Sequence, residues 1–494
     1  MSKSPWIGFV IREQSRWTKF IRIVGLGYGV RVLILFSVIA GGCASPKNPT
    51  QIPQEPRNII LVIADDVGAE QVPSYASELR FSRRFHPVNL EAVAELEAAG
   101  VRFREAWSNP TCSPTRAGIH TGQYPWVHGV THPLDEKDPN PLDGTKCSSL
   151  PSMMPSRYKT ALFGKWHLGY SSPALPRNHD WDHYAGSLGG HLPSYNKWDK
   201  TIDDDPPIIE YSTHATIDVV DDALAWITDC VNKDSLFLAV LAFNAPHGTL
   251  DKKGDWVWLS TDLSPDCYDT SRPLPDERSV YKAQLRCLDH ELGRLLRGLQ
   301  KDSPRALDQT MIIFIGDNGT PDEVVEEPIS ISPSTPNHAK ASLYQGGVHV
   351  PFIIADGRNL VAEEYRSKFP MIGHIAPPGR TTDALVHTRD LYSTILALAG
   401  TGSGGVPSRS LVPFLTSASA TEPDYVVTAD DNGCAIRDKT YKLIKLNSGR
   451  EEFYDLILTP WEKTPLTISS LKSAQSDALN NLNAHLLSIG ATCK

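Results

Sequence analysis

The sequence lacks closely spaced cysteines and an excess of positive charge. None of its 8 cysteines stands in the C-x-x-C spacing of a zinc site, which argues against metal thiolates. The formal net charge is −9, and residues 1–42 contribute +5 to it, so the rest of the chain carries −14. A body this acidic argues against nucleic acid or another polyanion held on a broad basic face. Any anion site must therefore be local and built from a few cations.

The N-terminus lacks an apolar run long enough to span a membrane. Basic residues precede the run VLILFSVIAGG, which begins after Arg31 and ends before Cys43. This pattern predicts an export signal over residues 1–43, and IAGGC resembles a bacterial lipoprotein processing site in which Cys43 receives lipid. Ordinary signal cleavage and an uncleaved anchor are the alternatives. Residues 44–56 are Pro-rich and predict a tether, so we expect the body in the periplasm or anchored to the outer membrane.

Six cysteines remain once Cys43 and Cys112 are set aside. An exported protein can pair them, but their connectivity does not follow from the sequence. They are Cys147, Cys230, Cys267, Cys287, Cys434 and Cys493.

Short apolar runs alternate with helical patterns, which predicts an α/β fold: a large, mostly parallel sheet sandwiched by helices. The 494 residues leave room for a smaller second domain. Several runs end in polar residues, namely 58–66 (Asp65, Asp66), 160–169 (Lys165, His167), 236–247 (His247) and 311–319 (Asp317, Asn318). Another strand is expected at 350–356, and helices at 89–100 and 279–299. Since open α/β sheets bind ligands at the carboxyl edge, these polar groups are expected to gather there.

The stretch TCSPTRAGIHTG, residues 111–122, predicts a helix that starts beside a possible nucleophile. Ser113 is suited to cap the helix, and Pro114 to take its first position. Arg116 lies one turn after Cys112, so both would border the helix start. Free amides and the helix dipole there favour an anion. The pattern indicates a nucleophile aimed at an anionic group.

The polar set indicates a metal beside an anionic ester. Asp65, Asp66, Asp317 and Asn318 offer hard oxygen ligands, which suit Ca²⁺ or Mg²⁺ rather than zinc. Cations and proton donors are supplied by Arg116, Lys165, His167, His247 and Lys340. Each residue alone has a plain explanation as turn, cap or surface loop, but their joint occurrence at strand ends favours a site. The residues alone leave sulfate and phosphate esters open.

The chain resembles the sulfatase family, of the arylsulfatase type within the alkaline phosphatase superfamily. CSPTRAGIHTG matches the family signature C-x-P-[ST]-R-x-x-x-x-T-G, and similarity continues from about residue 58 to the C-terminus through GKWHLG, AFNAPH, GDNGT and KASLYQGGVHVPFI. The resemblance implies an alkaline phosphatase-like catalytic domain over 57–402. It also implies a C-terminal α+β subdomain over 403–494, where YVVTADDNGCAIRDKTYKLIKL contains two strand-like stretches around a turn, before a terminal helix.

The resemblance also implies a modified nucleophile. A separate maturation enzyme would convert Cys112 to Cα-formylglycine, whose hydrate carries two hydroxyls. One would attack sulfur and expel the alcohol. Loss of a proton from the other would then expel sulfate by C–O cleavage and restore the aldehyde.

Each polar residue receives a role from the same resemblance. Ca²⁺, with Mg²⁺ less favoured, would be bound by Asp65, Asp66, Asp317 and Asn318, and Asp317 could take a proton from the attacking hydroxyl. Arg116 would hold the hydrate, Lys165 and Lys340 would grip sulfate oxygens, and His167 would take the proton that triggers sulfate release. His247 would contact sulfate or, with Lys340, protonate the leaving oxygen.

Local departures from the family pattern are Gln345, where glutamate is common, and His349, where arginine is usual; both are interpreted as scaffold. Residues 321–339 form an acidic, Pro-rich insertion that is either a surface loop or a cleft wall. The aromatic residues in 178–199 could stack on a sugar or fill the core.

The function expected from the sequence is hydrolysis of sulfate esters, with sulfated carbohydrate preferred over small aryl sulfates as substrate. A phosphonate monoester or phosphodiester hydrolase of the same superfamily is the enzymatic alternative. A protein that is never matured and only binds sulfated glycans is the third hypothesis.

Overall fold

The computed structural model describes residues 57–491, apart from 79–86, 139–140, 270, 272, 327–337, 369–374, 376, 403, 418–419 and 422. The expected signal, tether and lipidated Cys43 lie outside the described residues, as does Cys493. Within the described ranges, every helix is too short or too polar to span a bilayer. The described residues belong to one compact unit, Pro53–Lys494.

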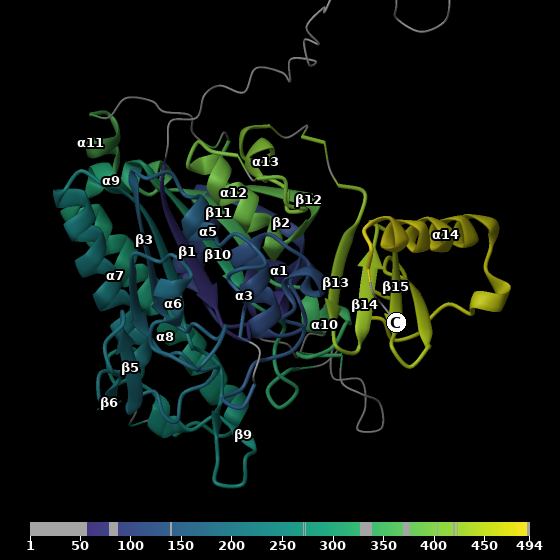
Figure 1. The fold of residues 1–494 in the computed structure, drawn as a ribbon, viewed down its shortest axis with the longest axis horizontal. Helices are drawn as coiled ribbons and strands as arrows, with labels where there is room; N and C mark the ends of the chain where they lie inside the picture. The colour runs from purple at the N-terminus through teal and green to yellow at the C-terminus, as the bar shows by residue number, and fades with distance from the viewer. Residues whose placement is uncertain are drawn as a thin grey trace, which may run out of the picture. The chain divides into compact units, whose positions relative to one another are not determined.

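A ten-stranded sheet forms the centre of the molecule, in the order β12-β2-β11-β10-β1-β7-β3-β4-β5-β6 (Figure 1). Its strands are β1 (Asn58–Ala64), β2 (Gly100–Trp107), β3 (Tyr158–Gly164), β4 (His183–Gly186), β5 (Trp198–Ile202), β6 (Ile208–Tyr211), β7 (Leu236–Ala242), β10 (Thr310–Gly316), β11 (Phe352–Asp356) and β12 (Arg380–His387). The neighbours β10, β1, β7 and β3 are mutually parallel, so their carboxyl ends share one edge. The predicted α/β class and mostly parallel sheet are confirmed.

The central strands are continuous apolar runs because both faces of the sheet are covered. Along β1, Ile60 and Val62 pack with α2 (Glu91–Ala99), α7 (Ala215–Asn232) and α8 (Glu277–Asp302). The alternate residues Ile59 and Leu61 belong to the opposite cluster, with α3 (Cys112–Thr121) and α12 (Leu391–Leu398). Side chains that alternate between two buried faces favour apolar residues along the middle of each strand.

Shorter elements surround the ten-stranded sheet. The further helices are α1 (Pro73–Glu78), α4 (Pro125–His128), α5 (Leu150–Met153), α6 (Leu175–Asn178), α9 (Pro304–Asp308), α10 (Gln345–Val348), α11 (Glu363–Arg366) and α13 (Val412–Thr416). A separate hairpin pairs β8 (Thr249–Leu250) with β9 (Trp256–Val257).

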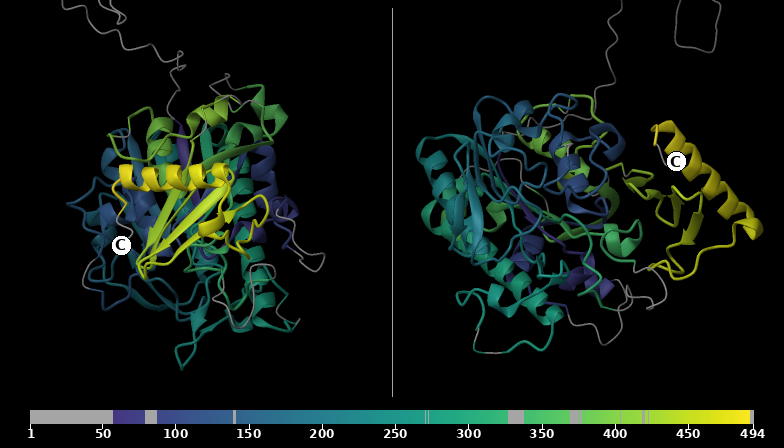
Figure 2. Two further views of the ribbon diagram at one scale, coloured as in Figure 1. Left: turned by 90° about the vertical axis from the view of Figure 1, so that its right-hand side faces the viewer. Right: turned by 60° about the horizontal axis from the view of Figure 1, so that its bottom comes forward.

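The C-terminal subdomain is an antiparallel sheet with one helix across it (Figure 2). Its strands are β13 (Val426–Asp430), β14 (Gly433–Arg437), β15 (Tyr441–Leu446) and β16 (Glu451–Asp455), and its helix is α14 (Ser473–Ser488). Leu482 and Leu486 of α14 pack on one face, while the other face packs around Trp107 of the main domain. The stretch 425–446 holds three strands where the sequence indicated two, because Gly433 and Asp438 allow two tight turns.

One disulfide links Cys267, in the loop before α8, to Cys287 within that helix. Cys434 is also disulfide-bonded. Cys112, Cys147 and Cys230 are buried free thiols.

Candidate active site

The predicted site residues gather at the carboxyl edge of the four parallel strands. Because β10, β1, β7 and β3 are adjacent, residues far apart in the sequence meet there. Asp65 and Asp66 follow β1, Lys165 and His167 follow β3, His247 comes after β7, and Asp317 and Asn318 follow β10. All seven are buried.

Each of the three aspartates pairs with its own cation. Lys165 Nζ lies 2.5 Å from Asp65 Oδ2, and Lys340 Nζ lies 2.6 Å from Asp66 Oδ1. Arg116 Nη2 donates to Asp317 Oδ2 at 2.8 Å, and its Nη1 donates to the Lys165 carbonyl at 2.9 Å. The three carboxylates and three cations form a buried cluster that is neutral overall.

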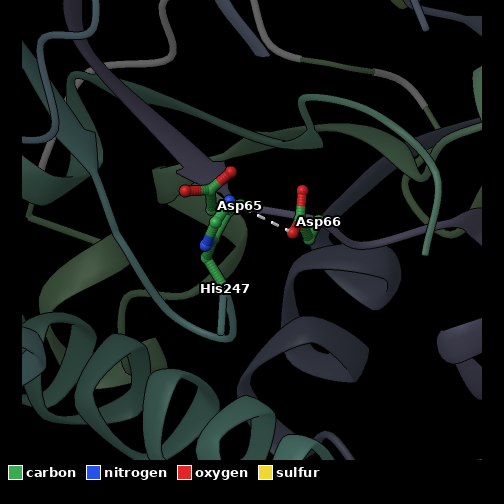
Figure 3. Close-up of side chains that lie close together, drawn as sticks. All are labelled: Asp65, Asp66 and His247. Carbon is green, nitrogen blue, oxygen red and sulfur yellow. Dashed lines mark ion pairs between the residues drawn. The ribbon is translucent and has the colours of Figure 1, made fainter. Parts of the chain in front are cut away.

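Two carboxylate groups and a histidine converge at a point suited to a cation. Ligand atoms of Asp65, Asp66 and His247 lie within 4.8 Å of one another, and His247 Nε2 is 3.6 Å from Asp66 Oδ2 (Figure 3). Asn318 Nδ2 donates to Asp66 Oδ1 at 2.8 Å. Asp317 instead faces Arg116 through Oδ2 and accepts from the Asp66 amide at 3.1 Å through Oδ1.

Two buried oxygens at this point have no hydrogen-bond donor, namely Asp65 Oδ1 and Asn318 Oδ1. An unpartnered buried oxygen is costly, and a hard cation would satisfy both. Burial, together with the neighbouring Asp317, raises the pKa of Asp65 well above its ordinary value. Burial acts the same way on Asp66, but His247 and Lys340 outweigh it and lower the pKa of Asp66 to about 2. The residues therefore fit a Ca²⁺-type ion.

The start of α3 differs from the sequence expectation in one detail. The helix begins at Cys112, so Pro114 is its third residue, and Thr111 precedes it without a side-chain cap. Ser113 is not the cap. Its Oγ donates to the His167 carbonyl at 2.9 Å and accepts from the Leu134 amide at 3.0 Å, because burial beside two loops gives it long-range partners. These bonds tie the helix start to the His167 loop.

Cys112 is 2% exposed and is not an activated thiol in this environment. Burial raises the pKa of its thiol above the ordinary value, although Lys165 and Lys340 act in the opposite direction. A nucleophilic cysteine needs a lowered pKa. The unmodified side chain is therefore a neutral thiol.

Both histidines are held by backbone carbonyls. His167 Nε2 lies 2.8 Å from the Leu134 carbonyl, and His247 Nδ1 lies 2.8 Å from the Gly248 carbonyl. A carbonyl only accepts, so these nitrogens carry the protons and leave His167 Nδ1 and His247 Nε2 as acceptors. Burial lowers both pKa values well below the ordinary histidine value. His167 also has φ of +55°, a conformation uncommon outside glycine and often found at functional sites.

A cleft of about 1010 Å³ opens onto this cluster. From the predicted set, it is lined by Asp66, Cys112, His167, His247 and Lys340. Asp65, Lys165, Arg116 and Asp317 lie behind this lining, where they hold its charged groups in place. Lys165 is fully buried against Asp65, so its contact with a sulfate oxygen stays a prediction.

Several residues of the cleft wall were not predicted from the sequence. They include Thr111, whose buried Oγ1 has no hydrogen-bond partner, together with Tyr170 and Trp256. Trp256 and Trp258 both line the cleft, and their spacing of two residues is a sequence signal for a shared face.

The aromatic segment 178–199 mainly builds the core. Trp181, Tyr184, Tyr195 and Trp198 are buried, whereas residues 187–193 and Asp199 line the cleft.

The other ambiguous positions are resolved in part. From the acidic insertion, Pro321, Asp322 and Glu323 line the cleft, while 327–337 lie outside the described residues. Gln345 Oε1 accepts from Trp107 Nε1 at 2.8 Å, and His349 Nε2 lies 2.7 Å from the Arg104 carbonyl, as expected of scaffold residues.

Comparisons with known proteins agree with this architecture. The family model Sulfatase matches residues 57–401. N-acetylgalactosamine-6-sulfatase of Canis lupus familiaris is 26% identical over 450 residues, 85% of this chain and 76% of the relative. An ulvan-active sulfatase of Formosa agariphila is 24% identical over 428 residues, 81% and 76% of the two chains. The solved structure of Ps i-CgsB in complex with k-i-k-neocarrahexaose shares the fold, with a TM-score of 0.67, 21% identity, and 87% and 93% coverage. The chain therefore belongs to the sulfatase family and is a sulfatase.

Proposed function

We propose that this sulfatase releases inorganic sulfate from sulfated saccharides, with formylglycine at position 112 and Ca²⁺ held by Asp65, Asp66, Asp317 and Asn318. The observation that carries the proposal is that Cys112, His167, His247 and Lys340 face one cleft above a cluster of paired carboxylates. A catalytic domain over 57–402 and a C-terminal subdomain over 403–494 are part of the same proposal.

The charge balance supports an anionic substrate. The buried carboxylates and cations cancel, so a bound divalent ion would leave the site with two positive charges facing the cleft. Ca²⁺ would supply neutralisation of the sulfate charge and polarisation of one of its oxygens. Lys340 is the cation of the cluster that is itself in the cleft lining, so it would contact the sulfate group directly. Arg116 holds the Asp317 carboxylate in place through two hydrogen bonds.

The state of Cys112 supports its modification. Because its thiol pKa is raised, the cysteine would attack an ester poorly at neutral pH. Formylglycine would supply a hydrate with one hydroxyl for attack and a second for self-release of sulfate. A formylglycine-generating maturation enzyme is therefore a required partner.

The two histidines can divide the proton transfers between them. His167 is neutral with Nδ1 free to accept, so it would take the proton whose loss releases sulfate. His247 presents Nε2 near Asp66 and Lys340. Because this nitrogen is an acceptor, His247 would have to take up a proton there before it could contact sulfate or, with Lys340, assist departure of the alcohol. Asp317 would take the proton of the attacking hydroxyl.

A saccharide substrate is supported by the relatives and by the size of the cleft. N-acetylgalactosamine-6-sulfatase and the ulvan-active sulfatase are named for saccharide substrates, and the solved structure holds a neocarrahexaose. The cleft volume of about 1010 Å³ lies in the range of sites that hold a ligand larger than sulfate alone.

Export with lipid attachment at Cys43 is proposed for the location of the enzyme. The disulfide between Cys267 and Cys287 supports an oxidising compartment. Expression in a Gram-negative host should place the protein in the membrane fraction, with a lipid-modified N-terminal peptide in its mass spectrum. Cys43→Ala should remove the lipid; an unmodified Cys43 in the wild-type protein would contradict the proposal.

The test of function compares two esters on one matured preparation. After co-expression with a formylglycine-generating enzyme, the protein should hydrolyse 4-nitrophenyl sulfate faster than 4-nitrophenyl phenylphosphonate. A preference for the phosphonate would favour the phosphodiester hydrolase alternative. An unmodified Cys112 thiol in protein from its native host would favour a binding protein that is never matured.

A further inference from the structure

The wall of the cleft beside His247 is a two-strand hairpin with an aromatic face. Trp256 on β9 is 37% exposed and lines the cleft, and Leu250 on β8 is its cross-strand partner and a second lining residue. The Trp256 ring meets the His247 ring edge-on, with centroids 4.8 Å apart. The apolar surface of Trp256 and Leu250 therefore lies directly beside His247, the residue expected to face the ester.

The hairpin is held firmly from behind. Two residues along the chain, Trp258 is buried and donates from Nε1 to the Pro246 carbonyl at 2.8 Å. It packs edge-on against Tyr281 of α8, whose hydroxyl donates to the Asp66 carbonyl at 2.8 Å. Trp258 therefore connects the end of the hairpin to α8, the helix that also holds the Asp66 backbone. Trp256 itself meets the rings of His191 and His247 edge-on, with centroids 5.4 and 4.8 Å away.

The rest of the lining is rich in carboxylates. Among the described lining residues, the lysines are Lys137 and Lys340. Five acidic residues line the cleft in addition to Asp66, namely Asp135, Glu136, Asp199, Asp322 and Glu323. Like charges in a shared cleft repel one another, so a second anionic group on the bound molecule would be disfavoured there.

We propose that Trp256 determines substrate specificity by stacking on the pyranose ring that carries the scissile sulfate, and that this ring bears no second anionic group. A pyranose offers an apolar C–H face that suits an indole ring, and burial of both from water favours the contact. The inference rests on the proposed function, because it assigns the alcohol part of the sulfate ester to this wall.

Binding measurements on Cys112→Ala protein with Ca²⁺ separate stacking from sulfate recognition. The probes are inorganic sulfate and the monosulfated monosaccharide that the matured wild-type enzyme desulfates fastest. Adding Trp256→Ala should weaken the saccharide sulfate about tenfold in isothermal titration, as expected for loss of an aromatic contact and its buried area. Binding of inorganic sulfate should stay unchanged, and Trp256→Phe should recover most of the affinity. Leu259→Ala, an exposed residue just after the hairpin and outside the cleft lining, is the matched control.

The second arm compares the monosulfate with the same sugar carrying two sulfates. The disulfated sugar should bind several-fold more weakly than the monosulfated sugar at low salt. The difference in affinity between the two sugars should become smaller with added salt, and also in the variants Glu136→Gln and Glu323→Gln. Three results would each overturn the proposal. Trp256→Ala could weaken the binding of inorganic sulfate as much as that of the saccharide sulfate, or it could leave the affinity for the saccharide sulfate unchanged. The disulfated sugar could also bind more tightly than the monosulfated one. If the matured wild-type enzyme desulfates no ester in the panel, the proposed function itself fails, which is a different result.

Discussion

At the scale of single residues, the site is a set of charges that cancel in pairs. Lys165 neutralises Asp65, Lys340 neutralises Asp66, and Arg116 neutralises Asp317. Burying one of these carboxylates without its cation would be strongly unfavourable. Catalytic and structural demands are therefore joined in the same side chains, and substitutions here must be judged by activity and stability together.

Lys340 is the cation of the cluster placed to touch the substrate. It lies between two parts of the site, because its amide donates to the Thr320 carbonyl and the next amide donates to the Pro110 carbonyl. Lys340→Ala should lower kcat about 100-fold, in line with loss of one charge-stabilising group in a buried site. Steady-state kinetics on a saccharide sulfate would measure this. Lys253→Ala, an exposed lysine outside the cleft lining, should leave kcat unchanged; equal losses in both would count against the assignment.

A metal ion should stabilise the folded protein as well as activate it. Binding at 100 times the Kd contributes about 2.7 kcal/mol, which corresponds to a Tm increase of a few degrees for a chain of this size. Thermal denaturation of chelator-treated protein should therefore show a rise in Tm on addition of Ca²⁺, and a smaller rise with Mg²⁺.

The Ca²⁺-dependent rise should vanish in Asn318→Ala and persist in Asp218→Asn. Asp218 is a buried aspartate paired with Lys200, away from the site. A rise in Tm that survives Asn318→Ala would show that the ion binds elsewhere.

At the scale of elements, two contacts connect the C-terminal sheet to segments near the site: a hydrogen bond made by a buried ion pair, and an ion pair at the surface. Lys442 of β15 and Glu462 are fully buried with Nζ and Oε1 2.5 Å apart, and Glu462 accepts from the Gln345 amide at the start of α10. His132, in the loop that forms one wall of the cleft, lies 3.0 Å from Asp431 in the turn between β13 and β14. The subdomain therefore contacts α10, which follows the lining residues Lys340 and Ala341, and the loop that contributes residues 133–137 to the lining.

Removal of one partner of the buried pair should be costly. Burial lowers the pKa of Lys442 to about 8, and Lys442→Met would leave Glu462 as an uncompensated buried charge. The expected loss in the free energy of unfolding is about 3–5 kcal/mol. Adding Glu462→Gln, which keeps the acceptor for the Gln345 amide, should recover much of it in chemical denaturation. If Lys442→Met alone were as stable as the wild-type protein, the ion pair would contribute nothing to stability.

The His132 contacts should stabilise the protein only at lower pH. A hydrogen bond to Asp138 and the nearby Asp431 raise the pKa of His132 in the folded state. The stabilisation is therefore complete below the ordinary histidine pKa and is lost as pH rises through the raised value. Because the side chain is largely exposed, His132→Gln should lower Tm by only about 1 °C at pH 5.5 and not at all at pH 9. A larger difference in Tm between wild-type protein and His132→Gln at pH 9 than at pH 5.5 would contradict this pH dependence.

At the scale of the whole molecule, the central fold could be predicted because its strands are buried on both faces. The runs that became β1, β7 and β10 are apolar after at most one polar residue at their start, and β3 is apolar after Lys159 and Thr160. The polar residues of the site begin where these strands stop. By contrast, β2 was not predicted, because Arg102, Arg104 and Glu105 interrupt its apolar pattern and pair with partners distant in the sequence.

The composition of the site could be read from the sequence, but its pairing could not. Which lysine faces which aspartate depends on the strand order β10-β1-β7-β3, and no local pattern encodes that order. Similarly, the local sequence predicts Ser113 as a helix cap, whereas its partners in the fold are the His167 carbonyl and the Leu134 amide. Trp256 was not predicted as a site residue because its hairpin lies outside the signature motifs. The tertiary fold brings it to the cleft.

The most direct test of the account is the yield of inorganic sulfate, measured by ion chromatography, from a panel of saccharide sulfates treated with protein whose position 112 is shown by mass spectrometry to be formylglycine. The account predicts one sulfate released for each ester cleaved, and no release above background by Cys112→Ala. Absence of sulfate from every ester, or equal release by Cys112→Ala, would contradict it.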